Sequence, residues 1–276
     1  MPFLLPGYTP APTRQHPDIL RRCPATTGLS KPAFALVLAL YSPFSFADYA
    51  ARVEYVIDGD TVVLENRDKL RLIGINAPEL DSSSFSTQGS TAQAHALEAR
   101  LALVELVAGR QVDVVPGVDP RDYYGRILAK VMLKDGTDVQ QELLLRGYAC
   151  AIAIPPNIQN LGRYLDAERI ARADRLGIWS DPDYVVDLDS NATVSRPGFA
   201  ILAGTVTGVN QSKRNYYFSI GNKLTIQVPG MKWQEYWPIP NARAVLGQRY
   251  EMRGWVKKRN DGYFVLISHP SMMVLQ

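Results

Sequence analysis

Residues 56–80, VIDGDTVVLENRDKLRLIGINAPEL, alternate short apolar runs with polar turns. The β-branched run at 61–64 and the apolar run at 70–75, together with the alternating pattern at 53–57, predict three short strands. Asp58-Gly59 and the polar residues that follow the second run predict the turns between them. We therefore expect this stretch to form a β-meander around which the rest of the first domain is built.

The ends of these runs carry the polar side chains Asp58, Asp60, Arg71, Asn76 and Glu79. Each has an ordinary structural explanation, because Asp58 and Asp60 suit a hairpin turn, Arg71 an exposed strand and Glu79 a turn cap. Taken together, the same residue types indicate a site for a metal ion and a phosphate, since carboxylates bind hard cations and arginine binds phosphate.

Phosphodiester cleavage requires an activated water, a cation that attracts the phosphate and fixed positive charge for the transition state. Asp60, the amide oxygen of Asn76 and the backbone oxygen of Ala77 are hard ligands of the kind that Ca²⁺ or Mg²⁺ accepts. The remaining candidates are Glu79, which would orient or deprotonate water, and two bidentate phosphate donors, Arg71 and Arg126.

Downstream of the meander, the pattern predicts two more strands and three helices. Leu97, Leu101, Val104 and Ala108 form a helical stripe that ends at Gly109, and His95 falls off this stripe, where we expect it to be solvated. The further strands are expected at 111–115 and 127–133, and the further helices at 139–146 and 161–176. Five strands with three helices predict a mainly β fold, a small OB-type barrel that carries helices on its flank.

A second all-β unit follows an acidic linker at residues 181–196. Its expected strands cover 200–209, 216–220, 224–228, 249–257 and 263–267. Five short strands again indicate a small, OB-like β-barrel. The predicted organisation is therefore a first domain at 48–180, the linker, and a basic second domain at 197–276.

The first 47 residues have the composition of a targeting segment. Lys31 precedes a short apolar run, and Ser45-Phe46-Ala47 places small residues at the two positions that a signal peptidase recognises. We expect a signal peptide and a secreted or periplasmic protein with no membrane span in its mature form. An uncleaved anchor and a start codon set too far upstream remain alternatives.

Three histidines and two cysteines, without neighbours at ligand spacing, argue against a zinc site. Removal of the targeting segment leaves Cys150 as a single thiol in the apolar run 148–152. A buried, unreactive thiol is the expected role.

Charge divides the mature chain. Residues 48–190 hold 15 Lys/Arg against 23 Asp/Glu, a net charge of −8, whereas residues 191–276 hold 11 against 3, a net charge of +8. Cations interleaved with aromatic rings suit a single-stranded polyanion, because cations hold phosphates and rings stack on bases. Two alternatives stay open, in which the rings form the barrel core or the two domains dock through opposite charge. The candidate nucleic-acid-binding residues are Lys213, Arg214, Tyr216, Trp255, Lys257, Lys258 and Arg259.

From residue 53 to 179 the chain resembles the staphylococcal nuclease (thermonuclease) family. The resemblance depends on an ordered set of motifs, Ile57-Asp58-Gly59-Asp60-Thr61-Val62, Arg71-Leu72, Pro78-Glu79, Tyr124-Gly125-Arg126 and Gly177-Ile178-Trp179. It implies an OB barrel with three helices, Ca²⁺ on Asp60, Glu79 as general base and Arg71 and Arg126 on the scissile phosphate. Asp58 would support the metal through its neighbours.

One departure from the family pattern concerns the metal. Asn76 stands where the family usually has a second metal carboxylate, so one negative charge is lost and weaker metal binding is expected. We therefore expect a secreted, Ca²⁺-dependent endonuclease acting on DNA, with RNA as a second substrate class and Mg²⁺ or another divalent ion as alternative cofactors. The rival hypothesis is a catalytically impaired, nuclease-fold protein that binds nucleic acid.

The second unit more loosely resembles the OB-fold nucleic-acid-binding modules that follow the nuclease domain in some secreted bacterial nucleases. The likeness is carried by residues 248–256 and 267–270. A monomer is expected.

Overall fold

The computed structural model describes residues 47–79, 90–190, 192, 194, 197–221, 224–239, 241–259 and 262–276. Every described residue belongs to one compact unit, Phe44–Gln276. Apart from its last residue, the expected signal peptide at 1–47 lies outside the described residues. The helices in the described ranges include none that is both long and apolar enough to cross a membrane.

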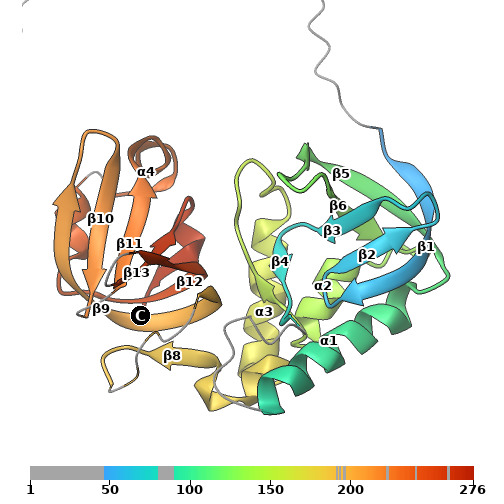
Figure 1. The fold of residues 1–276 in the computed structure, drawn as a ribbon, viewed down its shortest axis with the longest axis horizontal. Helices are drawn as coiled ribbons and strands as arrows, with labels where there is room; N and C mark the ends of the chain where they lie inside the picture. The colour runs from blue at the N-terminus through green and yellow to red at the C-terminus, as the bar shows by residue number, and fades with distance from the viewer. Residues whose placement is uncertain are drawn as a thin grey trace, which may run out of the picture. The chain divides into compact units, whose positions relative to one another are not determined.

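The expected meander forms one side of a closed barrel (Figure 1). The strand order is β1-β2-β3-β6-β5, in which β3 and β6 run parallel and the other neighbours are antiparallel. Side chains alternate between the faces of a strand, so Leu70 and Leu72 are buried while Arg71 points the other way. The mainly β class and the five-stranded barrel are confirmed. The strands are β1 (Tyr49–Asp58), β2 (Thr61–Leu64), β3 (Lys69–Leu72), β5 (Gln111–Arg121) and β6 (Ile127–Met132).

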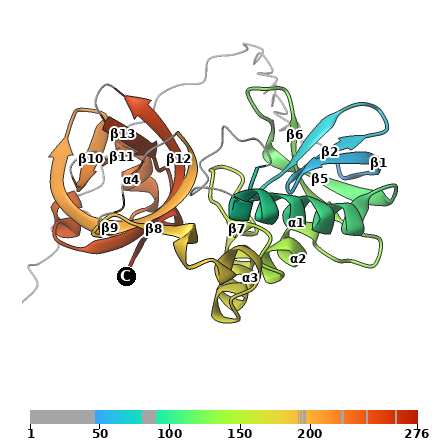
Figure 2. The same cartoon turned by 60° about the horizontal axis from the view of Figure 1, so that its bottom comes forward.

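Helices α1 (Ser90–Val107), α2 (Val139–Leu145) and α3 (Leu161–Ala173) share one apolar core with this barrel (Figure 2). The predicted buried face of α1 was wrong, because Leu97 and Leu101 are 46% and 52% exposed whereas Ala99 and Leu103 are fully buried. Apolar residues occur around most of this helix, so periodicity did not single out the contact face. The small side chain of Ala99 allows α1 to approach the β1–β2 turn closely.

Two very short strands leave the barrel and carry part of the site. The sequence predicted a single strand at 70–75, but Gly74 interrupts it with a φ of 79°. A Cβ at Gly74 would lie 2.7 Å from the ring of Tyr164 on α3, so only glycine fits this bend. After the bend, β4 (Ile75–Asn76) pairs antiparallel with β7 (Cys150–Ala151).

The second set of strands forms a seven-stranded sheet in the order β14-β12-β13-β11-β10-β9-β8. An additional β12–β9 pairing closes five of these strands into a ring, and they lie where the sequence predicted strands. The ring consists of β9 (Gly198–Gln211), β10 (Asn215–Ile220), β11 (Leu224–Pro229), β12 (Arg249–Arg259) and β13 (Gly262–Leu266).

Some elements of this sheet were not predicted. Strand β8 (Val185–Asp187) lies inside the segment 181–196 that was interpreted as a linker, and it pairs in parallel with β9. Strand β14 (Met273–Leu275) extends the other edge, and α4 (Gly230–Tyr236) buries Trp233. The 3₁₀ helices are Gly177–Ser180, Pro182–Tyr184, Ala242–Val245 and Pro270–Met272.

Candidate active site

The turn between β1 and β2 is shaped by Asp58. Its Oδ1 accepts a hydrogen bond of 3.1 Å from the backbone N–H of Asp60, the pattern of an Asx turn. Between them, Gly59 lies against Ala77, since a Cβ at this position would come within 2.6 Å of the Ala77 Cβ. Asp58 therefore has the turn-forming role that its sequence context allowed, and the turn brings Asp60 to β4.

Asp60 is buried and surrounded by donors. Its Oδ1 accepts from Thr61 Oγ1 at 3.1 Å, and its Oδ2 accepts from the backbone N–H of Ala77 at 2.7 Å and contacts the guanidinium of Arg71. Burial raises the pKa of Asp60 to about 6, although the positive charge of Arg71 acts to lower it. Proton and cation are therefore expected to compete for this carboxylate near neutral pH.

Arg71 connects Asp60 with Asn76. Its Nη2 donates a hydrogen bond of 2.9 Å to Asn76 Oδ1, and Asn76 Nδ2 donates to the backbone oxygen of Ala77 at 3.2 Å. The buried Nη1 atom of Arg71 forms an ion pair with Asp60 and has no hydrogen-bond partner within the described ranges. The structure thus brings Asp60, Arg71, Asn76 and Ala77 into one contiguous polar cluster, which we call the Asp60 cluster.

Arg126 is positioned by Asp122. Asp122 accepts hydrogen bonds from the backbone N–H groups of Tyr124 and Arg126, each at 2.9 Å, and from Arg126 Nε at 2.7 Å. Burial would raise the pKa of Asp122, but the hydrogen bonds from Arg126 outweigh it and lower that pKa. Asp122 was not among the predicted site residues; its position four residues before an arginine, with Gly125 between them, was the available signal.

The register of the barrel relates Arg126 to Arg71. Arg71 pairs with Leu128 across β3 and β6. Side chains alternate along a strand, so Arg126, two residues before Leu128, falls on the same face as Arg71. The guanidinium of Arg126 nevertheless contacts Asp122 and lies over the ring of Tyr124, not against the Asp60 cluster.

Glu79 is exposed and follows Ala77 by two residues. Consecutive Cα atoms are about 3.8 Å apart, so the Glu79 Cα lies within about 7.6 Å of the Ala77 Cα. Glu79 therefore lies on the chain segment that leaves the cluster, two residues beyond Ala77.

The oxygen atoms of the cluster suit a hard divalent cation in kind. They comprise one carboxylate from Asp60, one amide oxygen from Asn76 and one backbone oxygen from Ala77, which are donor types that Ca²⁺ and Mg²⁺ accept. Across the described ranges, His, Cys, Asp and Glu side chains form no group of three or more at metal-binding distances. Of the three candidate ligand oxygens in the cluster, those of Asn76 and Ala77 are neutral.

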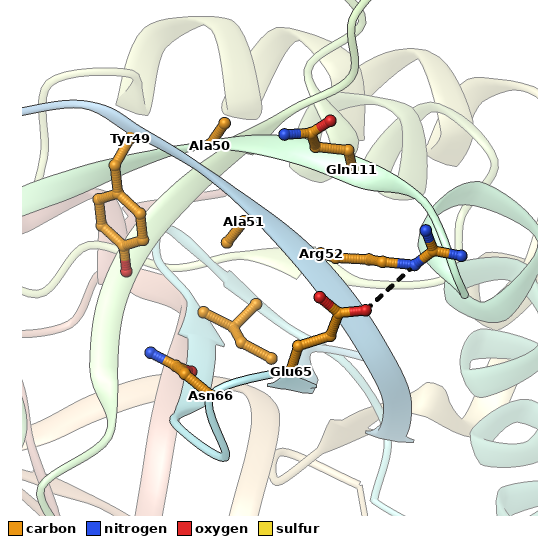
Figure 3. A pocket seen from close by; sticks show the side chains of 8 residues that line it. Tyr49, Ala50, Ala51, Arg52, Glu65, Asn66 and Gln111 are labelled. Carbon is orange, nitrogen blue, oxygen red and sulfur yellow. Dashed lines mark ion pairs between the residues drawn. The ribbon is translucent and has the colours of Figure 1, made fainter.

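A cavity of about 480 Å³ lies elsewhere on the first barrel (Figure 3). Arg52 and Glu65 form an ion pair of 3.3 Å across it. No candidate catalytic or metal-binding residue lines this cavity, so it is separate from the Asp60 cluster. Its lining residues are Tyr49, Ala50, Ala51, Arg52, Leu64, Glu65, Asn66 and Gln111.

In the second barrel, two of the candidate aromatic residues pack against other rings. The ring centroid of Tyr216 lies 5.1 Å from that of Trp233, and Trp255 meets Phe199 edge-on, also at 5.1 Å. These contacts agree with the alternative in which the rings belong to the barrel core. The five candidate cations remain exposed, Lys213 and Arg214 between β9 and β10, and Lys257, Lys258 and Arg259 at the end of β12.

A second cavity, of about 230 Å³, lies on the outside of this barrel. It is lined by Arg259 and by residues of three neighbouring strands. Tyr217 of β10 pairs with Gln227 of β11, and Thr225 of β11 pairs with Phe264 of β13. The predicted set included Tyr216 but not Tyr217, which faces the other side of the same strand and lines this cavity. The lining residues are Tyr217, Thr225, Gln227, Arg259, Gly262, Tyr263 and Phe264.

Two other expectations concern single residues. Cys150 is a buried free thiol, as predicted, and burial raises its pKa to about 12. His95 was expected to be solvated, but its side chain is only 13% exposed and its ring meets Tyr184 edge-on.

Comparison with known proteins relates the first barrel to nucleases. The family model described as "Staphylococcal nuclease homologue" matches residues 69–181, which include Arg71, Asn76, Glu79 and Arg126. An "Uncharacterized endonuclease" of Escherichia coli is 36% identical over 156 residues, which cover 54% of this chain and 90% of that protein.

Two further relatives match a similar share of the chain. The "Thermonuclease" of Staphylococcus intermedius is 28% identical over 168 residues, covering 56% of this chain and 96% of that protein. The "Endonuclease YhcR" of Bacillus subtilis is 28% identical over 157 residues, covering 53% of this chain but only 13% of that much longer protein. The chain belongs to the staphylococcal nuclease family.

Proposed function

We propose that this protein is a secreted or periplasmic, Ca²⁺-dependent endonuclease that hydrolyses phosphodiester bonds in DNA, with RNA as a second substrate class. The observation that carries the proposal is the Asp60 cluster, in which a buried carboxylate, an arginine and two neutral oxygens are linked by direct contacts. The membership of the chain in the staphylococcal nuclease family supports the same chemistry.

Each residue has a proposed role in the reaction. Arg71 and Arg126 hold the non-bridging oxygens of the scissile phosphate and stabilise the charge that grows on them. Glu79 accepts a proton from the attacking water. At the same time the water oxygen bonds to phosphorus, and the bond from phosphorus to the leaving oxygen breaks. Asp60, Asn76 and Ala77 hold the cation. When bound, Ca²⁺, or Mg²⁺ or another divalent ion in its place, neutralises phosphate charge.

The second barrel is proposed to bind nucleic acid and to deliver it to the first. Its net charge of +8 opposes the −8 of the first barrel, which alone would repel a polyanion. The cavity beside Arg259 offers Tyr217 and Phe264 as rings on which bases can stack, next to the exposed cations Lys257 and Lys258. Export is supported by the sequence of residues 1–47, and we propose a monomer.

The test uses residues 48–276 and a circular single-stranded DNA, which only an endonuclease can open. We expect linear and then shorter products with Ca²⁺ and none with a chelator. Cleavage that persists in the chelator would contradict the metal-dependent proposal.

The second candidate function is a nuclease-fold protein that binds nucleic acid without cleaving it. The observation in its favour is Asn76, which provides a neutral oxygen that already accepts a hydrogen bond from Arg71. Retained DNA binding without Ca²⁺-dependent cleavage would establish this candidate and overturn the first.

A further inference from the structure

Four charged side chains form a closed network between α3 and β12. Glu168 and Arg172 come from α3, and Glu251 and Arg253 from β12. Arg253 Nη1 donates to Glu168 Oε2 and Arg253 Nη2 to Glu251 Oε1, each at 2.7 Å. Arg172 makes a bidentate pair with Glu251 at 2.8 Å and contacts Glu168 at 2.8 Å.

The network is buried and electrically balanced. Glu168, Glu251 and Arg253 are only 3%, 6% and 5% exposed, and two carboxylates face two guanidinium groups. Burial would raise the pKa of Glu251, but the hydrogen bonds from Arg172 and the charge of Arg253 outweigh it and lower that pKa. Removing one partner would leave an uncompensated buried charge and would therefore weaken the network.

The same network holds both backbone polar groups of Ala151 in β7. Arg253 Nη1 donates to the Ala151 oxygen at 3.0 Å, and the Ala151 N–H donates to Glu168 Oε2 at 2.6 Å. Apolar contacts reinforce this attachment, because Cys150 and Ile152 lie in the buried cluster that contains Met252.

Strand β7 in turn supports the strand that carries the candidate ligands. Ala151 pairs with Ile75 and Cys150 with Asn76, while the Cys150 thiol donates to the backbone oxygen of Asn76 at 3.4 Å. The N–H of Ile152 also donates to the Gly74 oxygen at 2.9 Å. A two-residue strand pair has little stability of its own, so its position depends on what holds its outer side.

We propose that Arg253, together with Glu168, is a positioning pair that fixes β7 and, through it, the Asn76 and Ala77 oxygens of the cation site. The second barrel is then part of the scaffold of the nuclease site as well as a surface for nucleic acid. This inference rests on the proposed function for its consequence in cation binding, but the support of β4 by β7 can be measured without any metal.

Arg253→Lys and Glu251→Gln, made in residues 48–276, separate positioning from simple attachment of the two barrels. Lys keeps the charge of Arg253 but has one nitrogen in place of the planar fork, so it cannot reproduce the separate contacts that Nη1 makes with Ala151 and Glu168 and that Nη2 makes with Glu251. Glu251 is the matched control, because it belongs to the same network and is equally buried. Its carboxylate accepts hydrogen bonds from the side chains of Arg172 and Arg253. Arg253, in contrast, also donates to the backbone of β7. Both substitutions should therefore weaken the network, but Arg253→Lys alone should also weaken the contact with the Ala151 backbone.

Amide hydrogen exchange of the metal-free protein gives the first measurement. In Arg253→Lys we expect exchange at Ala151, Ile152 and Ala77 to accelerate by about tenfold, the effect of losing a hydrogen bond to a charged group. Exchange in the first barrel at Val62 and Val63 should stay within about twofold, and Glu251→Gln should leave all five amides within that range.

Calorimetric titration with Ca²⁺ gives the second measurement. Residues that orient metal ligands typically change affinity by about 10-fold or more, so Arg253→Lys should weaken Ca²⁺ binding by about tenfold and Glu251→Gln by less than about twofold. Equal responses of the two variants in either measurement, or unchanged exchange at Ala151 and Ala77, would overturn the positioning role.

Failure of the proposed cofactor and failure of the positioning role give different results. If the parent protein binds no Ca²⁺, the proposed cofactor is wrong, and the exchange data still decide whether Arg253 supports β4. If Arg253→Lys does not fold, Glu168→Gln replaces it, because it keeps an acceptor for the Ala151 N–H while releasing Arg253. The same pattern of exchange is then expected, and its absence would equally overturn the proposal.

Discussion

The two barrels use charge in opposite ways. In the first, the polar groups proposed to hold the cation are buried at the ends of strands, where Asp60 and Asn76 are 5% and 3% exposed. In the second, the cations Lys257, Lys258 and Arg259 are exposed, while the buried charges are matched within the network described above. A group that must hold a fixed geometry is buried among partners, whereas a group that attracts a polyanion from a distance works at the surface.

The largest expected effect comes from removing the proposed base of the first barrel. Glu79→Gln should lower kcat by about 10²–10⁴-fold, the usual contribution of a general base, and should leave DNA affinity within about twofold. Single-turnover cleavage and fluorescence anisotropy measure the two quantities. Glu65→Gln, at an exposed glutamate outside the cluster, is the matched control and should be fully active. An active Glu79→Gln enzyme would remove Glu79 from the mechanism.

Restoring a second carboxylate tests the metal ligands. Asn76→Asp should tighten Ca²⁺ binding by about tenfold, because it adds a negative charge at a buried site. Without Ca²⁺ the same substitution should lower stability by about 1–2 kcal/mol, and Ca²⁺ should reverse this loss.

Asn157→Asp is the matched control for that substitution. Asn157 is also buried, but it hydrogen-bonds the backbone of Asp119 and lies outside the Asp60 cluster. Its aspartate variant should be destabilised with and without Ca²⁺. Rescue of both variants by Ca²⁺, or of neither, would show that Asn76 is not a ligand.

The raised pKa of Asp60 predicts how cation binding changes with pH. Because the cation needs the carboxylate form and the pKa is about 6, Ca²⁺ affinity should fall by about tenfold between pH 7 and 5 and level off above pH 7. In chelator, protonation of Asp60 favours the folded state, so its contribution to stability is full below the ordinary value of 3.8 and is lost as pH rises through about 6. Titrations and thermal melts at three pH values measure both trends; a Ca²⁺ affinity independent of pH would refute them.

The smallest effect is expected at the surface of the second barrel. Replacing Lys257, Lys258 and Arg259 together by Gln should weaken single-stranded DNA binding and reduce the slope of log K against log salt by about 2, or about 0.7 for each phosphate that is no longer neutralised. Substitution is preferable to deletion of residues 191–276, which would also leave Glu168 without Arg253. The control replaces three exposed arginines of the first domain, Arg110, Arg163 and Arg169. Equal slopes for the two triple variants would favour the alternative in which the basic charge has no specific role.

Local patterns predicted much of the fold. Alternation and β-branching located the meander, and the order of motifs around Asp60 and Arg71 located the candidate site, because these signals lie within a few residues of each other. The buried face of α1 was not predictable, since its alanines and leucines are distributed around the helix and Gly59, in the β1–β2 turn, decides which alanine it meets.

Contacts between residues far apart in the chain could not be predicted from local sequence patterns. The break at Gly74 depends on the ring of Tyr164, which is 90 residues away along the chain. The pairing of Arg253 with Glu168 spans 85 residues and has no local signature. Tyr216 and Tyr217 occupy opposite faces of β10, and Tyr216 is the one whose ring packs against the distant Trp233.

The division of labour between the barrels is tested most directly by the ratio of kcat/KM for a 20-nucleotide single strand to kcat/KM for a dinucleotide. We predict that the Lys257, Lys258 and Arg259 triple variant lowers this ratio several-fold by affecting the long substrate alone, whereas Glu79→Gln lowers both rates and leaves the ratio unchanged. A triple variant that loses activity equally on both substrates, or a ratio that it does not alter, would contradict the account.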